Sequence, residues 1–404
     1  MSDVREIKKL SEVCDFQNGF AFKSNKFKSD GLPILRISNI QNNHISTKDL
    51  VFFDVNDYKE DFERYKVLKN DIIIAMSGGT TGKIGINQTD NIYYLNQRVG
   101  KFSPKKNLDR QYLFYFLHTK SEESLKIAGG AAQPNLSTEQ IKNFQIPVPS
   151  ITKQRTIVAK LDQAFAAIDQ AKANIEKNIA NAKELFQSKL NQIFSEKGEG
   201  FIEEKLDNVL IKTKNINPKD FPGKTFRYVD VSAVDRNKLE ITEFSEINSD
   251  NAPSRARKLI LENDVIFATV RPTLRRVALI DKNFDSQICS TGYVVLRNNN
   301  NKLLPKMIYY YLLTSYFLEN IEKLQKGASY PAVTDGEVKS QLINYPKSLE
   351  TQQQIVTQLD QLQEQTNVLV TKYQQKLANL EELKKSILEK AFKGELSTAA
   401  IEKV

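Results

Sequence analysis

Two long stretches of the chain carry apolar residues at spacings of three and four, a pattern that predicts helices with one buried stripe. The first stripe comprises Val158, Leu161, Phe165, Ile168, Ile175, Ile179, Ala182, Phe186 and Ile193, with one gap at Lys172. The second comprises Ile355, Leu359, Leu362, Leu369, Tyr373, Leu380, Leu383 and Ile387. No proline falls between Pro149 and Pro218 or after Pro346, so both helices can run unbroken. Each apolar seam needs a partner, and the simplest partner is the other helix.

The two stretches belong to an internal repeat. QRTIVAKLDQ begins at Gln154 and QQQIVTQLDQ at Gln352, and six of the ten positions match at a shift of 198. Four earlier blocks recur in the same order, at shifts between 193 and 198: KLSEV with KLDNV, LKNDIIIA with LENDVIFA, YLFYFL with IYYYLL, and GAAQPNLS with GASYPAVT. The chain is therefore interpreted as a tandem duplication.

The duplication predicts the fold class. We expect an α+β protein with two mixed α/β domains in tandem, each followed by a long helix. The two helices are expected to pair as an antiparallel coiled coil with pseudo-twofold symmetry, which places the domains at opposite ends of a rod. A coiled coil that dimerises two chains is the alternative. The predicted segments are a first domain (1–150), a first spacer helix (151–199), a second domain (200–350), a second spacer helix (351–396) and a C-terminal tail (397–404).

Shorter patterns indicate the elements within the domains. Buried strands are expected where β-branched residues run together, at 71–76 and 264–270. Partial alternation at 32–40 and 225–234 is typical of half-buried strands. The apolar runs YLFYFLHT and IYYYLLTSYFL are expected to form buried helices.

Composition narrows the class of protein. The chain has 404 residues, of which 40% are hydrophobic and 26% charged, as in a globular protein of two or three domains. The formal charge of +9 permits local patches that bind nucleic acid. The distant Cys14 and Cys289 provide neither a disulfide framework nor a metal site, and they favour a cytoplasmic location.

A glycine-rich loop follows the first predicted buried strand. SGGTTGKIG (77–85) does not fit the spacing of a nucleotide-binding P-loop, but its backbone donors lie beside Thr80, Thr81 and Lys83. Such a loop suits a DNA phosphate or a base edge. A simple hairpin turn is the alternative.

The second half carries VRPTLRR (270–276) at the equivalent place. Arginine binds phosphates and pairs bidentately with guanine, so DNA contact is favoured over a solvated charged surface. The arginines predicted to contact DNA, here and nearby, are Arg271, Arg275, Arg276, Arg255 and Arg257.

The repeated proline loops add three candidates for DNA contact. Gln133 and Asn135 in the first loop could bind adenine, and Tyr330 in the second could stack on a base or reach a phosphate. A fixed turn into the next segment is equally compatible with both loops.

Enzymatic motifs are mostly missing. The sequence has no D/N-P-P-Y/F tetrapeptide, no G-x-G-x-x-G after a strand and no H-E-x-x-H. We therefore expect no catalysis by this chain alone, and no catalytic, cofactor-binding or metal-binding residue. An enzyme with an unrecognised motif is the alternative.

Taken together, these motifs give the chain a resemblance to the specificity (S) subunits of type I restriction-modification systems. The passages that carry it are DIIIAMSGGTTGKIGI, IPVPSITKQRTIVAKLDQ with its later copy YPKSLETQQQIVTQLDQ, and the terminal ILEKAFKGEL. VRPTLRR lacks the glycine-rich form of this loop. The resemblance covers essentially the whole chain.

The resemblance implies that 1–150 and 200–350 are target recognition domains, each reading one half of a bipartite, asymmetric DNA sequence. It implies that the helices space the domains and dock two methyltransferase (M) subunits, which carry S-adenosylmethionine. Restriction (R) subunits would use ATP and Mg²⁺, and this chain would hold no cofactor. A stand-alone coiled-coil protein that binds DNA or acts as a scaffold, without a methylation partner, is the alternative.

Overall fold

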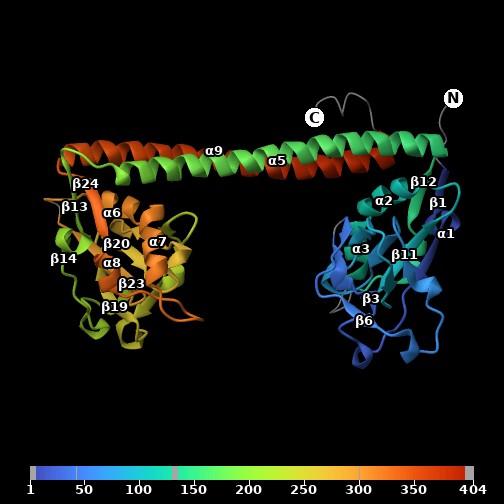
Figure 1. The fold of residues 1–404 in the computed structure, drawn as a ribbon, viewed down its shortest axis with the longest axis horizontal. Coiled ribbons are helices and arrows are strands. Elements are labelled where there is room, and N and C mark those ends of the chain that lie inside the picture. Colours follow the sequence, from blue (N-terminus) through green and yellow to red (C-terminus); the bar gives the residue numbers. More distant parts are fainter. Residues whose placement is uncertain (1–5, 42, 130–134, 300, 396–404) are drawn as a thin grey trace. The chain divides into compact units, whose positions relative to one another are not determined.

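The computed structural model describes residues 6–41, 43–129, 135–299 and 301–395. The chain divides into two compact units (Figure 1). Unit 1 comprises Met1–Ile175 and Gln375–Val404, and unit 2 comprises Glu176–Gln374. Both division points fall inside long helices. Each unit therefore contains one mixed α/β domain together with a stretch of each long helix.

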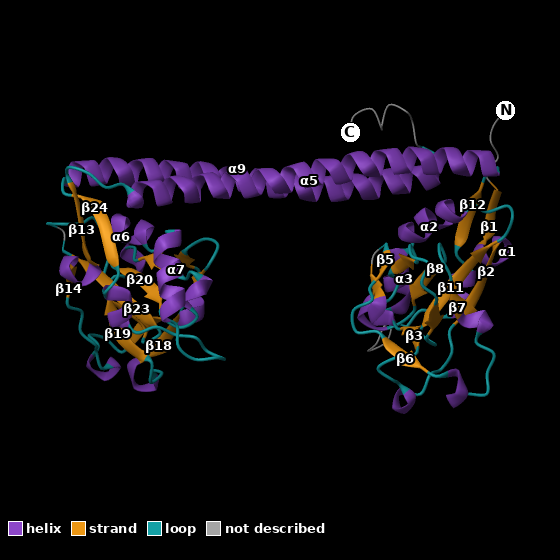
Figure 2. Cartoon of the chain, in the orientation of Figure 1, coloured by secondary structure: helices purple, strands orange, loops and turns teal. Residues whose placement is uncertain are grey.

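In unit 1 the domain combines short strands with three helices (Figure 2). The strands are β1 (Glu6–Lys9), β2 (Cys14–Asn18), β3 (Leu32–Leu35), β4 (Ile40–Gln41), β5 (His44–Ile45), β6 (Val51–Phe53), β7 (Lys66–Val67), β8 (Ile72–Ala75), β9 (Ile84–Ile86), β10 (Tyr93–Leu95), β11 (Val99–Pro104) and β12 (Gln145–Val148). The helices are α2 (Arg110–Thr119), α3 (Ser121–Ala128) and α4 (Thr138–Lys142), with the single turn α1 (Leu10–Val13) after β1.

The domain of unit 2 repeats this order. Its strands are β13 (Phe201–Lys205), β14 (Leu210–Ile211), β15 (Thr225–Val229), β16 (Val234–Asp235), β17 (Glu240–Ile241), β18 (Ser245–Asn248), β19 (Ala256–Ile260), β20 (Val265–Ala268), β21 (Val277–Leu279), β22 (Gln287–Ser290), β23 (Tyr293–Asn298) and β24 (Leu342–Pro346). Its helices are α6 (Pro305–Tyr311), α7 (Ser315–Leu324) and α8 (Asp335–Lys339).

The sheets confirm the duplication at the level of topology. The order β2-β11-β8-β9 in unit 1 corresponds to β14-β23-β20-β21 in unit 2. The order β6-β3-β10-β7 likewise corresponds to β18-β15-β22-β19, and the pairs β1-β12 and β4-β5 correspond to β13-β24 and β16-β17. The two units therefore share one framework, although few of their residues match.

The predicted buried strands are confirmed as β8 and β20. Every residue of both strands is fully buried, as expected for β-branched runs at the centre of a domain. The strand expected at 32–40 is wrong beyond β3. Buried Asn39 accepts a hydrogen bond from the Arg36 amide and donates to the carbonyls of Ser46 and Lys48, which closes a 3₁₀ turn there. The strand expected at 225–234 is interrupted by a 3₁₀ turn at the equivalent place.

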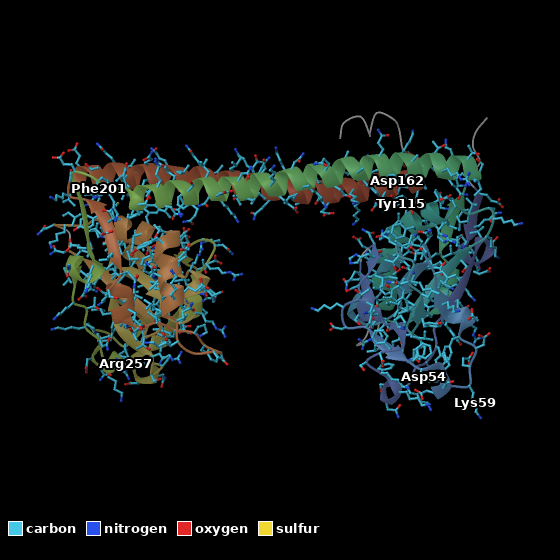
Figure 3. The ribbon with its side chains drawn as sticks, in the orientation of Figure 1. Asp54, Lys59, Tyr115, Asp162, Phe201 and Arg257 are labelled. Carbon is cyan, nitrogen blue, oxygen red and sulfur yellow. The ribbon has the colours of Figure 1, made fainter. Side chains whose placement is uncertain are left out.

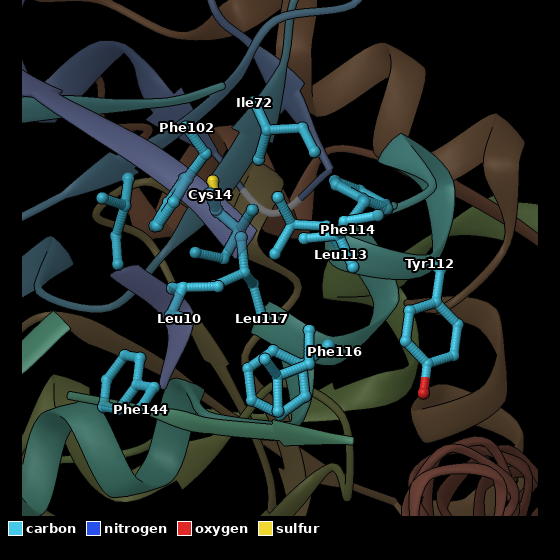
Figure 4. Close-up of a cluster of buried hydrophobic side chains, with 14 of the residues drawn as sticks. Leu10, Cys14, Ile72, Phe102, Tyr112, Leu113, Phe114, Phe116, Leu117 and Phe144 are labelled. Carbon is cyan, nitrogen blue, oxygen red and sulfur yellow. The ribbon is translucent and has the colours of Figure 1, made fainter. Parts of the chain in front are cut away.

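The largest core of unit 1 lies between the sheet that contains β8 and helix α2. Figure 4 shows Ile72 and Phe102 from the sheet beside Leu113, Phe116 and Leu117 from α2. All five side chains are at most 2% exposed. The same core takes in side chains from both long helices, which therefore stabilise the domain as well as each other.

The long helices are α5 (Ile151–Ser195) and α9 (Leu349–Lys393). Inside unit 1 they run antiparallel, because Lys384 pairs with Asp169 at 3.0 Å and Glu381 pairs with Lys172 one turn along. The second ion pair occupies the gap in the apolar stripe at Lys172. In the described part of the chain, no helix combines the length and apolar composition of a membrane span.

Inside unit 2, the end of α5 and the start of α9 join one core. Leu190 and Ile193 of α5 share it with Val356 and Leu359 of α9. Because the last turns of one helix meet the first turns of the other, the pairing in this unit is antiparallel as well.

A buried glutamine attaches each domain to its helix. Gln154 donates to the carbonyls of Asn107 and Pro149 and accepts from the Asp109 amide, at 2.7–3.0 Å. In unit 2, Gln352 makes the three equivalent bonds at 2.8–2.9 Å, to the carbonyls of Lys302 and Pro346 and from the Leu304 amide. Both side chains are completely buried. The repeated glutamine therefore has a structural role.

A tyrosine and an aspartate form a second repeated attachment. In unit 1 the Tyr115 hydroxyl donates to Asp162, and Figure 3 shows these two residues together where α2 meets α5. In unit 2 the Tyr310 hydroxyl donates to Asp360 at 2.6 Å. These bonds align α2 with α6 at a shift of 195. The sequence match of YLFYFL with IYYYLL had placed the shift at 196, one residue further.

Candidate nucleic-acid interface

In unit 1 the glycine-rich loop and the first proline loop meet beside β8. The Leu136 amide donates to the Met76 carbonyl at 2.7 Å, and Ser77 and Asn135 form a β-bridge. Asn135 is exposed at this junction. Gln133, the other candidate in this proline loop, lies outside the described residues.

The same junction forms beside β20 in unit 2. The Val333 amide donates to the Thr269 carbonyl at 2.9 Å, and Val270 and Ala332 form the β-bridge. These are the positions equivalent to those in unit 1. The loop after the buried strand and the proline loop, which were predicted as separate candidates for DNA contact, therefore form one surface in each unit.

The backbone turn that follows each junction is also the same. In unit 1 the 3₁₀ turn Gly78–Thr80 begins at Gly78 (φ 73°) and is followed by Gly82 (φ 81°), both left-handed. In unit 2 the turn Pro272–Leu274 lies between Arg271 (φ 49°) and Arg275 (φ 54°), at the equivalent positions. Glycine adopts this conformation freely, whereas another residue pays about 1–2 kcal/mol for it. Two arginines in strained positions are a feature typical of functional sites.

Arg271 and Tyr330 form a pair across the junction in unit 2. The Arg271 guanidinium lies 4.9 Å from the centre of the Tyr330 ring, in a cation–π contact. The Arg271 amide donates to the Pro331 carbonyl at 2.7 Å, which fixes the position of its Cα relative to the proline loop. Tyr330 is 70% exposed, and Arg271 is exposed too. The backbone of the pair is therefore fixed by the proline loop, and both side chains are accessible to a ligand from solvent.

The other two arginines of this loop have different surroundings. Arg276 donates to the Val231 carbonyl at 2.6 Å and is half-buried, so its side chain supports the loop from within. Arg275 is exposed and lines a small hollow of about 200 Å³ together with Glu319 and Glu322 of α7.

The basic residues in β19 and directly before it also differ in their surroundings. Arg255 is exposed, and its carbonyl accepts from the Thr291 amide at 2.8 Å. Arg257 is half-exposed near Asn217, at the end of the unit away from α5 and α9 (Figure 3). Lys258, by contrast, donates to the Tyr293 carbonyl and pairs with Asp335 at 2.5 Å, so it belongs to the framework.

Two of the three candidates in the glycine-rich loop of unit 1 turn inward. Thr81 is 2% exposed, and its hydroxyl donates to the Gly78 carbonyl at 2.7 Å, which holds the turn. The Thr80 hydroxyl oxygen is buried as well. Lys83 remains partly exposed. A DNA contact by each of these residues stays a prediction.

Arg98 is a candidate that the sequence analysis did not identify. It is exposed between β10 and β11, and its carbonyl accepts from the Met76 amide at 2.9 Å. The equivalent position in unit 2 is Gly292, whose carbonyl accepts from Thr269 at 2.8 Å. A Cβ at Gly292 would lie 2.3 Å from Val231, so no side chain fits there. Strand pairing, which aligns these positions, was the signal that could have revealed Arg98.

Titratable groups elsewhere have ordinary structural surroundings. Burial raises the pKa of Cys14 to about 12 and raises that of Cys289 as well, so both thiols stay protonated at neutral pH. Burial and the nearby Lys384 lower the pKa of His118 to about 4, which keeps the ring neutral. Among the described residues, no group of three or more His, Cys, Asp or Glu side chains could hold a metal ion.

Comparisons with known proteins give one result along the whole chain. The sequence profile of the type I restriction modification DNA specificity domain matches residues 2–181 and again 184–379. The EcoKI specificity subunit of Escherichia coli K12 is 26% identical over 96% of this chain and 88% of its own length. The MjaVIII specificity subunit of Methanocaldococcus jannaschii is 32% identical, over 43% of each chain.

Solved structures share the fold. A chain from a structure that addresses the complex assembly and conformational transition of the type I R-M system has a TM-score of 0.75, at 20% identity, covering 97% of this chain and 98% of its own. The HsdS subunit from Thermoanaerobacter tengcongensis has a TM-score of 0.58, at 21% identity, covering 97% of each chain.

Proposed function

Because the chain belongs to the type I restriction-modification DNA specificity family, we propose that it reads a bipartite, asymmetric DNA target and directs modification and restriction subunits to it. One observation supports two different half-sites above all others. The two units share their sheets, junctions and turns, yet the turn is flanked by Gly78 and Gly82 in one and by Arg271 and Arg275 in the other. A common framework with different polar groups suits two readers of different sequences.

The proposal divides the chemistry among several chains. Two methyltransferase subunits would bring S-adenosylmethionine and modify adenine, and restriction subunits would bring ATP and Mg²⁺. This chain would catalyse nothing and hold no cofactor, and it would act in the cytoplasm, where it has access to DNA. The stand-alone scaffold is less favoured, because both halves match the family of subunits that work within such systems.

Long-read detection of N6-methyladenine in the source genome, with and without this gene, tests the proposal. We expect a gene-dependent motif of two short blocks around an undefined gap. The protein, affinity-purified from the same cells, should bring methyltransferase subunits with it. If neither the mark nor such subunits depended on this gene, the scaffold would replace the proposed function.

A further inference from the structure

We propose that Arg271 and Tyr330 together read a guanine in the half-site that unit 2 recognises. This inference rests on the proposed function and adds a base identity to it. It rests on three observations: the backbone at Arg271 is fixed, its guanidinium lies over the Tyr330 ring, and the neighbouring Arg275 and Arg276 lack this arrangement.

The backbone at Arg271 is fixed from both sides. Its amide donates to Pro331, and the adjacent Val270 is bridged to Ala332. The residue keeps φ 49° where unit 1 has Gly78, so a side chain persists at a position that favours glycine. The turn itself does not need this side chain, because unit 1 forms the same turn without one. We infer that the arginine is there for an external ligand.

The Tyr330 ring orients the guanidinium. A guanidinium that stacks on an aromatic ring leaves its N–H edge free, and this edge matches the O6 and N7 acceptors of guanine. Within the described part of the chain, the Arg271 side chain donates a single hydrogen bond to the protein, and it is long, 3.5 Å to the Ser329 carbonyl. Its donors are therefore available, while the stacking limits the side-chain freedom that binding would otherwise remove.

The neighbouring arginines lack this arrangement. Arg276 donates to Val231 inside the domain, and Arg275 lies beside Glu319 and Glu322. Arg275 nevertheless shares the charge, the exposure and the left-handed backbone of Arg271. It is consequently a matched control for any effect of charge or backbone strain.

The experiment uses the full chain co-expressed with its methyltransferase subunits. Long-read sequencing first defines the methylated motif of the wild-type protein, and duplexes with each base at every position of that motif then serve as probes. The variants are Arg271→Gly and Arg275→Gly, since glycine preserves the left-handed turn and removes the guanidinium. Tyr330→Phe keeps the stacking ring, and Tyr330→Leu removes it.

We expect Arg271→Gly to lose discrimination at a single G·C pair, in one block only, by about 5- to 150-fold, the range for one bidentate contact. Tyr330→Leu should relax the same position to a smaller degree, and Tyr330→Phe should retain wild-type discrimination. Arg275→Gly should leave the base preference at every position within about 2-fold, since the Arg275 guanidinium is oriented by no aromatic ring among the described residues.

Several results would overturn the inference while leaving the proposed function intact. One is a wild-type bipartite motif that Arg271→Gly leaves unchanged. Another is a uniform loss of affinity for all duplexes in both Arg271→Gly and Arg275→Gly, which indicates phosphate contact. A relaxed position that is not a G·C pair also contradicts it. The proposed function itself fails only if the wild-type protein confers no bipartite motif.

Discussion

The turn after β8 and the turn after β20 share two backbone hydrogen bonds at equivalent positions but carry different side chains. Unit 1 has glycines at 78 and 82 where unit 2 has Arg271 and Arg275. On the neighbouring loop the exchange is reversed, with Arg98 in unit 1 and Gly292 in unit 2. Each unit therefore presents arginine from a different side of the same junction. The shared fold brings both loops to the junction, and the residue types in each unit decide which of the two loops carries arginine.

This difference teaches that the junction between the loops is held mainly by hydrogen bonds of backbone atoms. The strand pairing, the Leu136–Met76 and Val333–Thr269 bonds and the glutamine attachments all use main-chain donors or acceptors within each domain. Side chains at the junction are therefore free to diverge without loss of the fold. Substitutions at equivalent contacts should therefore affect the two units equally, and substitutions at divergent side chains should affect them differently.

The largest effect is expected at the matched glutamines. Gln154→Leu and Gln352→Leu each leave three backbone groups without their partner, which should cost about 3–5 kcal/mol of local stability. Hydrogen exchange at α2 and α6 measures the loss in each unit separately, because a chain of several units need not unfold in two states. Equal losses of local stability in the two units would show that Gln154 and Gln352 stabilise their domains to the same extent. A loss in only one unit would show that the attachments differ in strength.

Arginine at residue 82 should destabilise unit 1 by about 2–4 kcal/mol, through left-handed strain together with overpacking. A Cβ at Gly82 would lie 2.9 Å from the Ser124 Cβ on α3. Gly78→Arg is the control, because its nearest neighbour is Ile37 Cδ1 at 3.2 Å, and it should cost about 1 kcal/mol. Hydrogen exchange of α3 distinguishes the two. Similar costs would mean that α3 does not restrict this position.

The reverse changes should stabilise unit 2. Arg271→Gly and Arg275→Gly each relieve a left-handed strain, with an expected gain of up to about 1 kcal/mol. The gain should be smaller for Arg271, which gives up its cation–π contact with Tyr330. Hydrogen exchange at α7, which lies in unit 2, is a suitable measurement because it reports on this unit alone. Destabilisation by either glycine would contradict the assignment of strain.

The smallest effect is a difference in pH dependence between the helix caps. Glu337 accepts from the Thr334 amide and hydroxyl and pairs with Lys326, and these contacts lower its pKa from 4.5 to about 2. The stabilisation of α8 is thus complete above pH 4.5 and is lost as pH falls from there toward about 2. Gln140 caps α4 at the equivalent place and does not titrate.

Hydrogen exchange between pH 5 and pH 2 should therefore show protection falling at α8 and not at α4, after correction for the intrinsic exchange rate. Glu337→Gln copies the residue of unit 1 and should remove the difference. Parallel loss at both caps would indicate general acid unfolding instead.

Local patterns predicted the framework. The stripes from Val158 to Ile193 and from Ile355 to Ile387 gave both helices, and the repeat gave the common architecture. These patterns can be recognised in the sequence because the apolar spacing recurs at every turn of a helix and the matched blocks recur in both halves of the chain. The sequence alignment of α2 with α6 was wrong by one residue, because runs of apolar and aromatic residues match almost equally well in two registers.

The sequence predicted which loops form the candidate site but not how their individual side chains are placed. Thr81 and Arg276 read as surface polar residues, yet both bond to carbonyls of their own domain. The pairing of Arg271 with Tyr330 depends on a junction between distant segments, and the strain at Arg271 depends on a backbone angle. Neither follows from spacing or composition. Arg98 was missed because its loop has no recognisable motif.

The glutamine attachments have a consequence for inheritance. Gln154 and Gln352 hold their domains through three main-chain atoms each, on segments before α2 and α6 and at the helix start. Those atoms are present whatever residues a domain carries, provided that positions 109 and 304, which donate their amides, are not proline. A recombination event that joined a foreign domain at the first turn of either helix would therefore preserve the attachment. Under the proposed function, such a chain would acquire a new DNA address in one genetic step, with the glutamine itself unchanged.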